Sequence, residues 1–210
     1  MNVTVFGATG GIGIQAVEQA LAAGHRVTAV VRDPRRLPIR SDLLDVMIAD
    51  ALDGDSIAPA VKGRDAVLSA VGPRPGGPTT VCSAAAAAIT SALHQTSTRR
   101  LVIVSAAGPY VDAGDDPLSR YLIKPILRRA LRESFADLRA AEDVVRSSEL
   151  AWTILRPPRL TDKPATGRVR HAHDRNLPLG IFCSRADVAI QMLRAMADPA
   201  TIGHSIAIGN

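Results

Sequence analysis

The sequence has 210 residues, 47% of them hydrophobic, with a formal net charge of +5 and two cysteines. This length is enough for one well-buried core, so we expect a single domain over residues 1–210. Aromatic residues make up only 3% of the chain, and no helix-turn-helix or zinc spacing is visible, which argues against nucleic-acid binding. No apolar run approaches the roughly 20 residues of a membrane span. The cysteines form no disulfide framework and no signal peptide precedes the first expected strand, so we expect a cytoplasmic protein without a membrane partner.

The N-terminal segment predicts a strand followed closely by a helix. Residues 3–6 alternate apolar and β-branched side chains, which is typical of a strand. Beyond a glycine-rich turn, Ile14, Val17 and Leu21 recur at helical spacing. A strand, a glycine turn and a helix in succession are the context that a phosphate-binding loop requires.

Each glycine of this turn has a distinct expected role. Gly7 permits a sharp exit from the strand, Gly10 lets backbone N–H groups approach a diphosphate, and Gly13 lets the helix pack close to the strand. The glycines are spaced three and three, not two and three as in the dehydrogenase fingerprint, so a purely structural turn is the alternative. The helix N-terminus favours negative charge. The candidate diphosphate-binding residues are Gly7, Thr9, Gly10, Gly11 and Ile12.

A second strand is expected over residues 26–32, and its end indicates which coenzyme is bound. At this position an acidic residue binds the ribose hydroxyls, whereas an arginine accommodates a 2′-phosphate. Asp33 precedes Pro34, a pair typical of a helix N-cap and the first helical position. We therefore assign Asp33 to capping and Arg32, helped by Arg36, to the extra phosphate of NADP, which favours NADPH over NADH. A solvated arginine turn is the alternative.

Strands and helices continue to alternate along the chain. Further strands are expected over residues 45–49, 66–71, 100–104, 150–155 and 205–208, and helices over 56–61, 80–94, 118–131 and 135–147, with another after Ser184. Thr79 or Thr80 would cap the helix that carries the alanine run 84–88, a run that suits either packing against the sheet or a subunit interface. The alternation predicts an α/β fold, a doubly wound Rossmann-type parallel sheet with helices on both faces. Residues of about 157–183 would form a small C-terminal substrate lobe, in a monomer or a homodimer.

Candidate site residues follow several strands, because the carboxyl ends of parallel strands share one edge of the sheet. Asp50, Ala51 and Leu52 would face the adenine, and the remaining cofactor candidates at strand ends are Val71, Gly72, Ser105 and Pro157. The candidate catalytic residues are Ser105, Arg74 and Arg159. Ser105 would bond the nicotinamide carboxamide or the acceptor, and the arginines would hold acidic groups of an acceptor. The alternatives are a plain strand-end hydrogen bond and solvent-facing loop charges.

Two other features indicate no chemistry of their own. His171 and His173 would lie on one side of a strand, but no third ligand is evident, so we expect no metal site. Cys82 lies at a helix start, where a thiol can acidify, although a buried structural cysteine is the more common reading.

Three segments carry a resemblance to a known family: residues 7–13 (GATGGIG), 31–33 (VRD) and 148–157 (SELAWTILRP). They are similar to those of the atypical short-chain dehydrogenase/reductases, specifically the NAD(P)H-binding, NmrA-like branch and its biliverdin reductase B or flavin reductase type. The resemblance extends over nearly the whole chain. It implies an NADPH-dependent reductase that transfers a hydride to a flat conjugated acceptor such as a flavin, bound beside Gly72 and Arg74.

The resemblance also leaves the acid–base chemistry open. The wider superfamily pairs a serine with Tyr-x-x-x-Lys, whereas this chain offers Tyr121 and Lys124, one residue closer together. Positions three apart share a helix face, but Pro125 disfavours helical geometry at Lys124, and amphipathic packing is the alternative. The second function that the resemblance implies is a non-catalytic NADP(H) sensor of the NmrA-like type.

Overall fold

The computed structural model describes residues 1–73 and 80–210. The strands of the main sheet are β1 (Asn2–Phe6), β2 (Arg26–Val31), β3 (Leu44–Ile48), β4 (Ala66–Ser69), β5 (Arg100–Val104), β6 (Ala151–Arg156), β8 (Arg170–His173) and β10 (His204–Gly209). Their spatial order is β3-β2-β1-β4-β5-β6-β10-β8, and all neighbours run parallel except β8, which is antiparallel to β10. The first six follow the strand order typical of dinucleotide-binding folds, so the predicted Rossmann-type sheet is confirmed.

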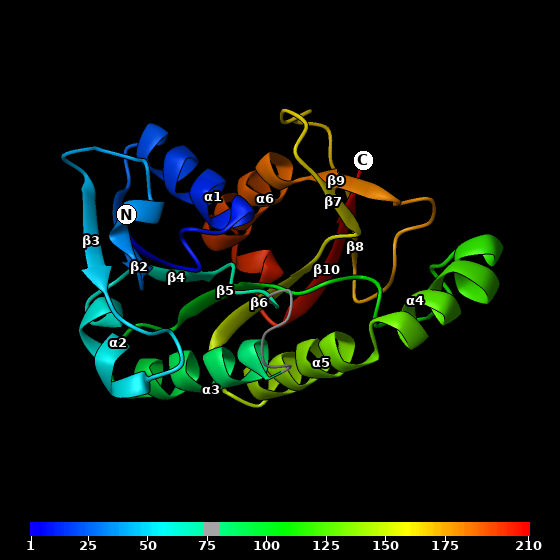
Figure 1. Ribbon diagram of the computed structural model, residues 1–210, viewed down its shortest axis with the longest axis horizontal. Coiled ribbons are helices and arrows are strands. Elements are labelled where there is room, and N and C mark those ends of the chain that lie inside the picture. Colours follow the sequence, from blue (N-terminus) through cyan, green and yellow to red (C-terminus); the bar gives the residue numbers. More distant parts are fainter. Residues whose placement is uncertain (74–79) are drawn as a thin grey trace.

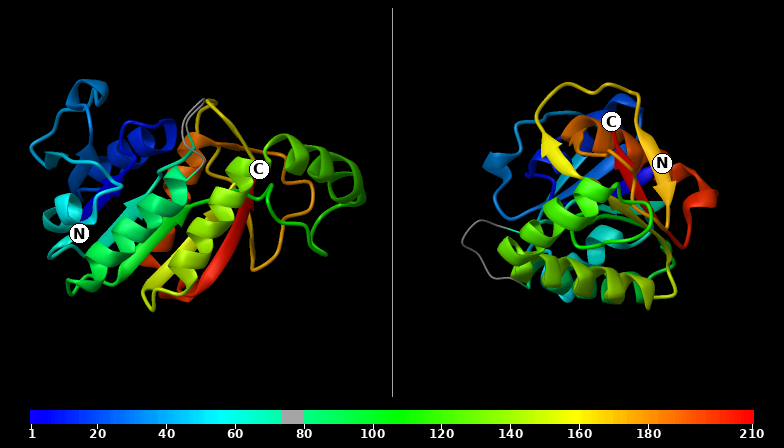
Figure 2. Two further views of the ribbon diagram at one scale, coloured as in Figure 1. Left: turned by 60° about the horizontal axis from the view of Figure 1, so that its bottom comes forward. Right: turned by 90° about the vertical axis from the view of Figure 1, so that its right-hand side faces the viewer.

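Helices cover both faces of the sheet (Figure 1). On one face lie α1 (Gly11–Ala22) and α6 (Arg185–Ala197), and on the other α2 (Gly54–Val61), α3 (Val81–His94) and α5 (Arg132–Arg146). The end-on view in Figure 2 separates these two layers. Short helical turns lie at Pro34–Arg36 (η1), Ser119–Ile123 (η2, a π-helical turn) and Pro199–Thr201 (η3), and α4 (Lys124–Ala130) projects from the body.

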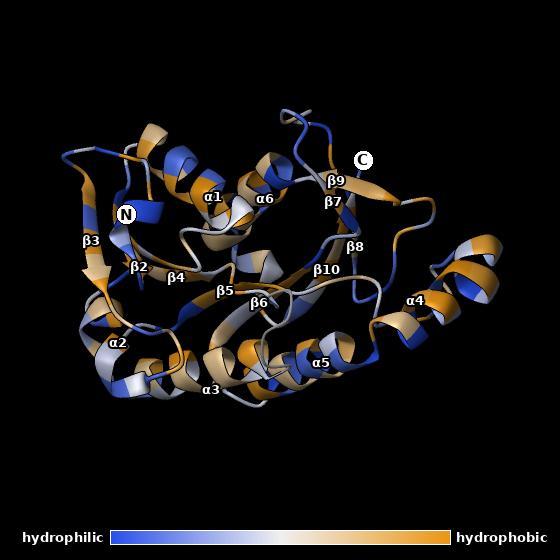
Figure 3. Ribbon diagram, in the orientation of Figure 1, coloured by the Kyte–Doolittle hydropathy of each residue, from blue (hydrophilic) through white to orange (hydrophobic). Residues whose placement is uncertain are grey.

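The central strands are apolar on both faces because each face is covered by helices. In β4, Leu68 belongs to the core beneath α1 and α6, while Val67 belongs to the core beneath α3 and α5. The same alternation separates Val102 from Leu101 in β5. Figure 3 shows the resulting hydrophobic colouring of the central strands. None of the described helices is long and apolar enough to cross a bilayer.

The alanine run of α3 packs inside the protein. Ala85, Ala86 and Ala88 are buried, and Ala86 and Ala88 belong to the core that α3 shares with α5. Small side chains let α3 approach its neighbours closely, so the packing interpretation of the run is confirmed for these residues.

The N-terminus of α3 is capped from another helix. Thr80 makes no side-chain capping bond, and Thr79 lies outside the described residues. Instead, the buried carboxylate of Asp137 in α5 accepts hydrogen bonds from the backbone N–H groups of Cys82 and Ser83, both at 2.8 Å. The expected threonine cap at Thr80 is therefore wrong, because a carboxylate from α5 takes the helix donors instead.

The C-terminal third of the chain joins the main sheet and adds a small ribbon at its edge. The strand expected at 205–208 is β10, which lies between β6 and β8. Strands β7 (Arg159–Thr161) and β9 (Phe182–Ser184) form a separate parallel pair within the expected lobe. The helix expected after Ser184 is α6, and Ser184 is its N-cap: the hydroxyl accepts from the Asp187 N–H at 3.0 Å.

Candidate functional site

The turn after β1 has no room for side chains at two of its glycines. Gly7 has a φ of +72°, and a methyl group there would lie 2.7 Å from the carbonyl carbon of Ala70. A methyl group at Gly13 would lie 2.0 Å from the Gly7 carbonyl oxygen. The Gly10 N–H closes the turn on that oxygen at 2.9 Å. The helix therefore starts directly against the strand, which brings its first N–H groups to the carboxyl edge of the sheet.

A cleft of about 500 Å³ opens above this turn at the carboxyl ends of β1, β2, β3 and β4. The cofactor candidates that line it are Gly7, Thr9, Gly10, Gly11, Ile12, Arg32, Arg36, Asp50, Ala51, Leu52, Val71 and Gly72. The structure thus brings together residues from four separate strand ends. The sequence reasoning missed other lining residues, among them Val31, Val81, Leu160 and Arg185.

The two candidates for recognition of the ribose, Asp33 and Arg32, have different surroundings in the structure. Asp33 caps the η1 turn and accepts from the backbone N–H of Arg35 at 3.1 Å, as expected. Its carboxylate also pairs with the Arg35 guanidinium at 2.9 Å, and this pairing holds the pKa of Asp33 below its ordinary value. Arg32 and Arg36 line the cleft instead. Two cationic side chains therefore line this end of the cleft, while the acidic candidate is used by the turn.

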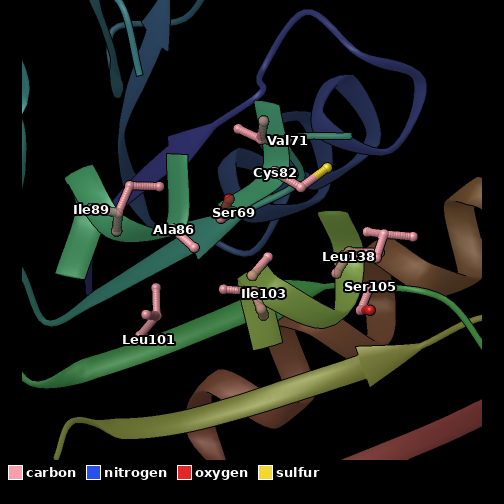
Figure 4. A pocket seen from close by; sticks show the side chains of 11 residues that line it. Ser69, Val71, Cys82, Ala86, Ile89, Leu101, Ile103, Ser105 and Leu138 are labelled. Atoms are coloured by element: carbon pink, nitrogen blue, oxygen red, sulfur yellow. The ribbon is translucent and has the colours of Figure 1, made fainter. Parts of the chain in front are cut away.

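Ser105 faces a small buried cavity between β5, α3 and α5, not the cleft itself. The cavity measures about 20 Å³, and Figure 4 shows Ser69, Cys82 and Ser105 among its lining side chains. Among the described residues, the Ser105 hydroxyl has no hydrogen-bond partner. Burial, together with the negative charge of Asp137, raises the pKa of the Cys82 thiol to about 12, so this cysteine is not an acidified nucleophile.

A second cleft, of about 520 Å³, lies beyond the ends of β5 and β6 and is mainly apolar. Pro157 and Arg159 line it, together with Phe135, Leu127 and Phe182. The Arg159 guanidinium lies 6.0 Å from the centre of the Phe182 ring. The mainly apolar lining, with one guanidinium from Arg159, is typical of a small-molecule pocket. Arg74, the third catalytic candidate, lies outside the described residues.

A buried ion pair lies at the end of β6, directly before Pro157 of the apolar cleft. Glu142 of α5 is fully buried and accepts from Arg156 Nε at 3.1 Å and Nη2 at 2.6 Å. The Arg156 guanidinium lies 3.5 Å from the centre of the Tyr110 ring. These contacts fix the chain where β6 ends and the cleft residue Pro157 follows.

Tyr121 and Lys124 do not form a catalytic pair. The Tyr121 side chain is 73% exposed, whereas Lys124 is buried and donates to Asp115 at 2.5 Å and to the Tyr110 carbonyl at 2.7 Å. Pro125 has no N–H to continue the normal helical pattern, and the chain forms a wider π-helical turn before it. A buried ion pair with Asp115, and not the expected amphipathic packing, therefore accounts for Lys124.

The histidines form no metal site in the described part of the chain. His171 and His173 lie on β8 as expected, with ring centres 5.9 Å apart, and His204 lies 5.2 Å from His173. No group of three potential ligands is present among the described residues.

Comparison with known proteins identifies the family. Residues 7–199, most of the chain, match the family described as NAD(P)H-binding. The chain belongs to the NAD(P)H-binding family. Among curated relatives, the uncharacterised protein YwnB of Bacillus subtilis is 26% identical over 205 residues, covering 95% of this chain and 93% of YwnB.

Solved structures show the same fold. A short-chain dehydrogenase/reductase from Veillonella parvula in complex with NADP superposes with a TM-score of 0.84 at 22% identity, covering 100% of this chain and 94% of that one. ChuY, an anaerobillin reductase from Escherichia coli O157:H7, superposes with a TM-score of 0.80 at 23% identity, covering 99% and 96%.

The cleft fits the dinucleotide that the NAD(P)H-binding family carries. The crowded glycines leave backbone N–H groups as the groups nearest a diphosphate, because a side chain at Gly7 or Gly13 would collide with the backbone. Gly10, the residue before α1, has no side chain with which to cap the helix. These donors therefore stay directed at the cleft.

Proposed function

We propose that this protein is an NADPH-dependent reductase that transfers a hydride to a flat conjugated acceptor, such as a flavin, in the manner of the flavin reductase type. One observation carries the proposal: strand β7 contributes to both clefts through consecutive residues. Leu160 lines the cleft above the glycine turn, and Arg159 lines the apolar cleft. A coenzyme in the first cleft and an acceptor in the second would therefore be neighbours on the two sides of β7.

The chain's own residues would bind the coenzyme, orient the acceptor and exclude water from both. When bound, the nicotinamide supplies the hydride, so the protein needs only to hold the acceptor against it. Arg32 and Arg36 would hold the 2′-phosphate. Ser105 lines a small cavity that shares Val71 with the coenzyme cleft, so its unpaired hydroxyl would bond the carboxamide only if that cavity opened toward the cleft. The apolar walls would exclude water, while Arg159 would offset negative charge on the acceptor. The neighbour named an anaerobillin reductase supports an extended conjugated acceptor.

A second candidate is an NADP(H) sensor without catalysis. The observation that favours it is the lack of a tyrosine–lysine acid–base pair at Tyr121 and Lys124. Tyr121 is exposed, whereas Lys124 is buried and bound to Asp115. In the sensor, binding of the coenzyme would change the affinity of the apolar cleft for a partner.

Turnover separates the two candidates. The protein is mixed with NADPH and an excess of FMN, riboflavin or a redox dye, and the nicotinamide absorbance is followed. Catalytic loss of absorbance with any acceptor supports the reductase. Tight NADPH binding without turnover across the panel would favour the sensor, and no binding of either coenzyme would contradict both.

Coenzyme choice is tested at Arg32. We expect Arg32→Glu to weaken NADPH binding far more than NADH binding, because only NADPH carries the 2′-phosphate. Arg40→Glu is the matched control, since Arg40 is exposed nearby and does not line the cleft. Calorimetry of both coenzymes measures the difference, and equal weakening of the two would show that Arg32 does not hold the phosphate.

A further inference from the structure

Arg185 reaches the glycine turn from a distant part of the chain. It is the first residue of α6, which begins beside α1: Gln19 Nε2 donates to the Ala186 carbonyl at 3.0 Å. The Arg185 side chain lies against Gly11, the first residue of α1. A methyl group at Gly11 would lie 2.5 Å from Arg185 Cδ. The guanidinium stem therefore occupies the space that the missing side chain of Gly11 leaves open.

The backbone of Arg185 is firmly held while its guanidinium is not. Ser184 and Asp187 lie on either side and are joined by the N-cap hydrogen bond of α6, and both are buried. The side chain itself is 31% exposed and donates to Asp162 Oδ1 at 2.6 Å. The Asp162 side chain is 88% exposed, and such exposed pairs stabilise a protein very little. A stronger anion at the same place would displace the Asp162 carboxylate.

We infer that Arg185 is a diphosphate-binding residue, and that Asp162 holds its guanidinium in the coenzyme-free protein. The inference rests on the proposed coenzyme cleft, which Arg185 lines at its glycine turn. There the first N–H groups of α1 and one guanidinium face the same space. Arginine can bind phosphate oxygens through two parallel hydrogen bonds, whereas Asp162 takes only one bond from this guanidinium.

Two different arginine roles follow from the position of each side chain. Arg32 lies at the end of β2, where the ribose phosphate would lie, whereas Arg185 lies at the glycine turn. The diphosphate is common to both coenzymes. Loss of Arg185 would therefore weaken NADPH and NADH alike, unlike loss of Arg32.

The experiment measures dissociation constants of NADPH and NADH by calorimetry for the full chain and three variants. Arg185→Gln removes the charge at the glycine turn. Asp162→Asn removes the competing carboxylate while keeping its shape. Arg194→Gln is the matched control, because Arg194 is exposed at the other end of α6 and loses the same charge.

We expect Arg185→Gln to raise both dissociation constants about 10- to 100-fold, the effect of losing charge-assisted hydrogen bonds. Asp162→Asn should lower both about two- to five-fold, because an exposed pair competes only weakly. Arg194→Gln should change neither by more than about two-fold.

Three results would overturn the inference. The first is that Arg185→Gln binds both coenzymes with dissociation constants within two-fold of those of the unmodified protein. The second is that Arg185→Gln weakens the binding of NADPH alone, and the third is that Asp162→Asn binds the coenzymes more weakly than the unmodified protein. Each leaves the proposed function intact if the unmodified protein binds coenzyme. Failure of the unmodified protein to bind either coenzyme would instead overturn the proposed function, and this inference with it. The Asp162→Asn measurement is decisive even if Arg185→Gln fails to fold, because it leaves the arginine in place.

Discussion

Replacing Asp137 with alanine tests whether α5 holds the start of α3. Asp137 is 5% exposed, and its carboxylate accepts from the backbone N–H groups of Cys82 and Ser83 at 2.8 Å and from the Ser83 hydroxyl at 2.6 Å. The next residue back, Val81, lines the candidate coenzyme cleft. The change therefore perturbs both the stability of the protein and one wall of the cleft.

The magnitude follows from the groups left without partners. Alanine leaves two backbone N–H groups without an acceptor, and a buried unsatisfied donor costs about 1–3 kcal/mol. Loss of a carboxylate from a helix N-terminus adds up to about 1 kcal/mol. Water entering the vacated space offsets part of this, so we expect Asp137→Ala to lower the free energy of unfolding by about 3 kcal/mol. For a chain of this length, that corresponds to a fall in Tm of roughly 6–12 °C.

Urea denaturation followed by circular dichroism measures the change, with a constant m-value as the sign that the native state is otherwise intact. Asp143→Ala is the matched control, because Asp143 is an exposed acid on the same helix. Asp137→Asn keeps one acceptor oxygen and should fall between the two. If Asp137→Ala unfolds within about 0.5 kcal/mol of the unmodified protein, the cap contributes little and the reasoning is wrong.

Three further changes test other parts of the structure. Gly13→Ala places a methyl group 2.0 Å from the Gly7 carbonyl oxygen, so we expect a loss of about 3 kcal/mol or more by calorimetry, and an unchanged Tm would contradict the close packing. Glu142→Gln leaves Arg156 buried without its countercharge and should cost about 3–5 kcal/mol in urea, whereas the exposed control Glu149→Gln should cost almost nothing. Burial would raise the pKa of Asp187, but hydrogen bonds from Thr166, Gly167, Ser184 and Asn210 outweigh it and hold that pKa below its ordinary value. The stabilisation is therefore complete above about pH 4 and is lost as pH falls through the folded-state pKa; Asp187→Asn should flatten that loss in urea titrations, and an equally steep loss would refute it.

The sheet and the glycine turn could be predicted because their signals are local. Apolar runs such as residues 101–104 fill strands that are buried on both faces, and this burial leaves a continuous pattern in the sequence. Asp33 was assigned to its cap correctly because the capping bond spans two residues. The last strand, β10, is longer than expected and lies inside the sheet, which only the pairing with β6 and β8 reveals.

Features made by distant residues left no such signal. Thr80 has the local pattern of a cap, but Asp137, 55 residues beyond Cys82, takes its place. Arg185 follows a capping serine like any other first-turn residue, and nothing nearby in the sequence indicates that it returns to Gly11. The roles of Ser105, Arg74 and Arg159 stay predictions. The structure places Ser105 and Arg159 beside two different cavities, while Arg74 lies outside the described residues.

The position of β10 has a consequence for how the chain assembles during synthesis. Strand β6 ends at Arg156, but the strand that pairs with its outer side begins only at His204. During synthesis from the N-terminus, one edge of β6 has unpaired backbone donors and acceptors until β10 has been made. Strand β8 also has no partner until then, because it pairs with β10. Stalled or shortened chains that end before His204 would therefore expose the unpaired edge of β6. They would be the forms most prone to aggregate or to bind chaperones.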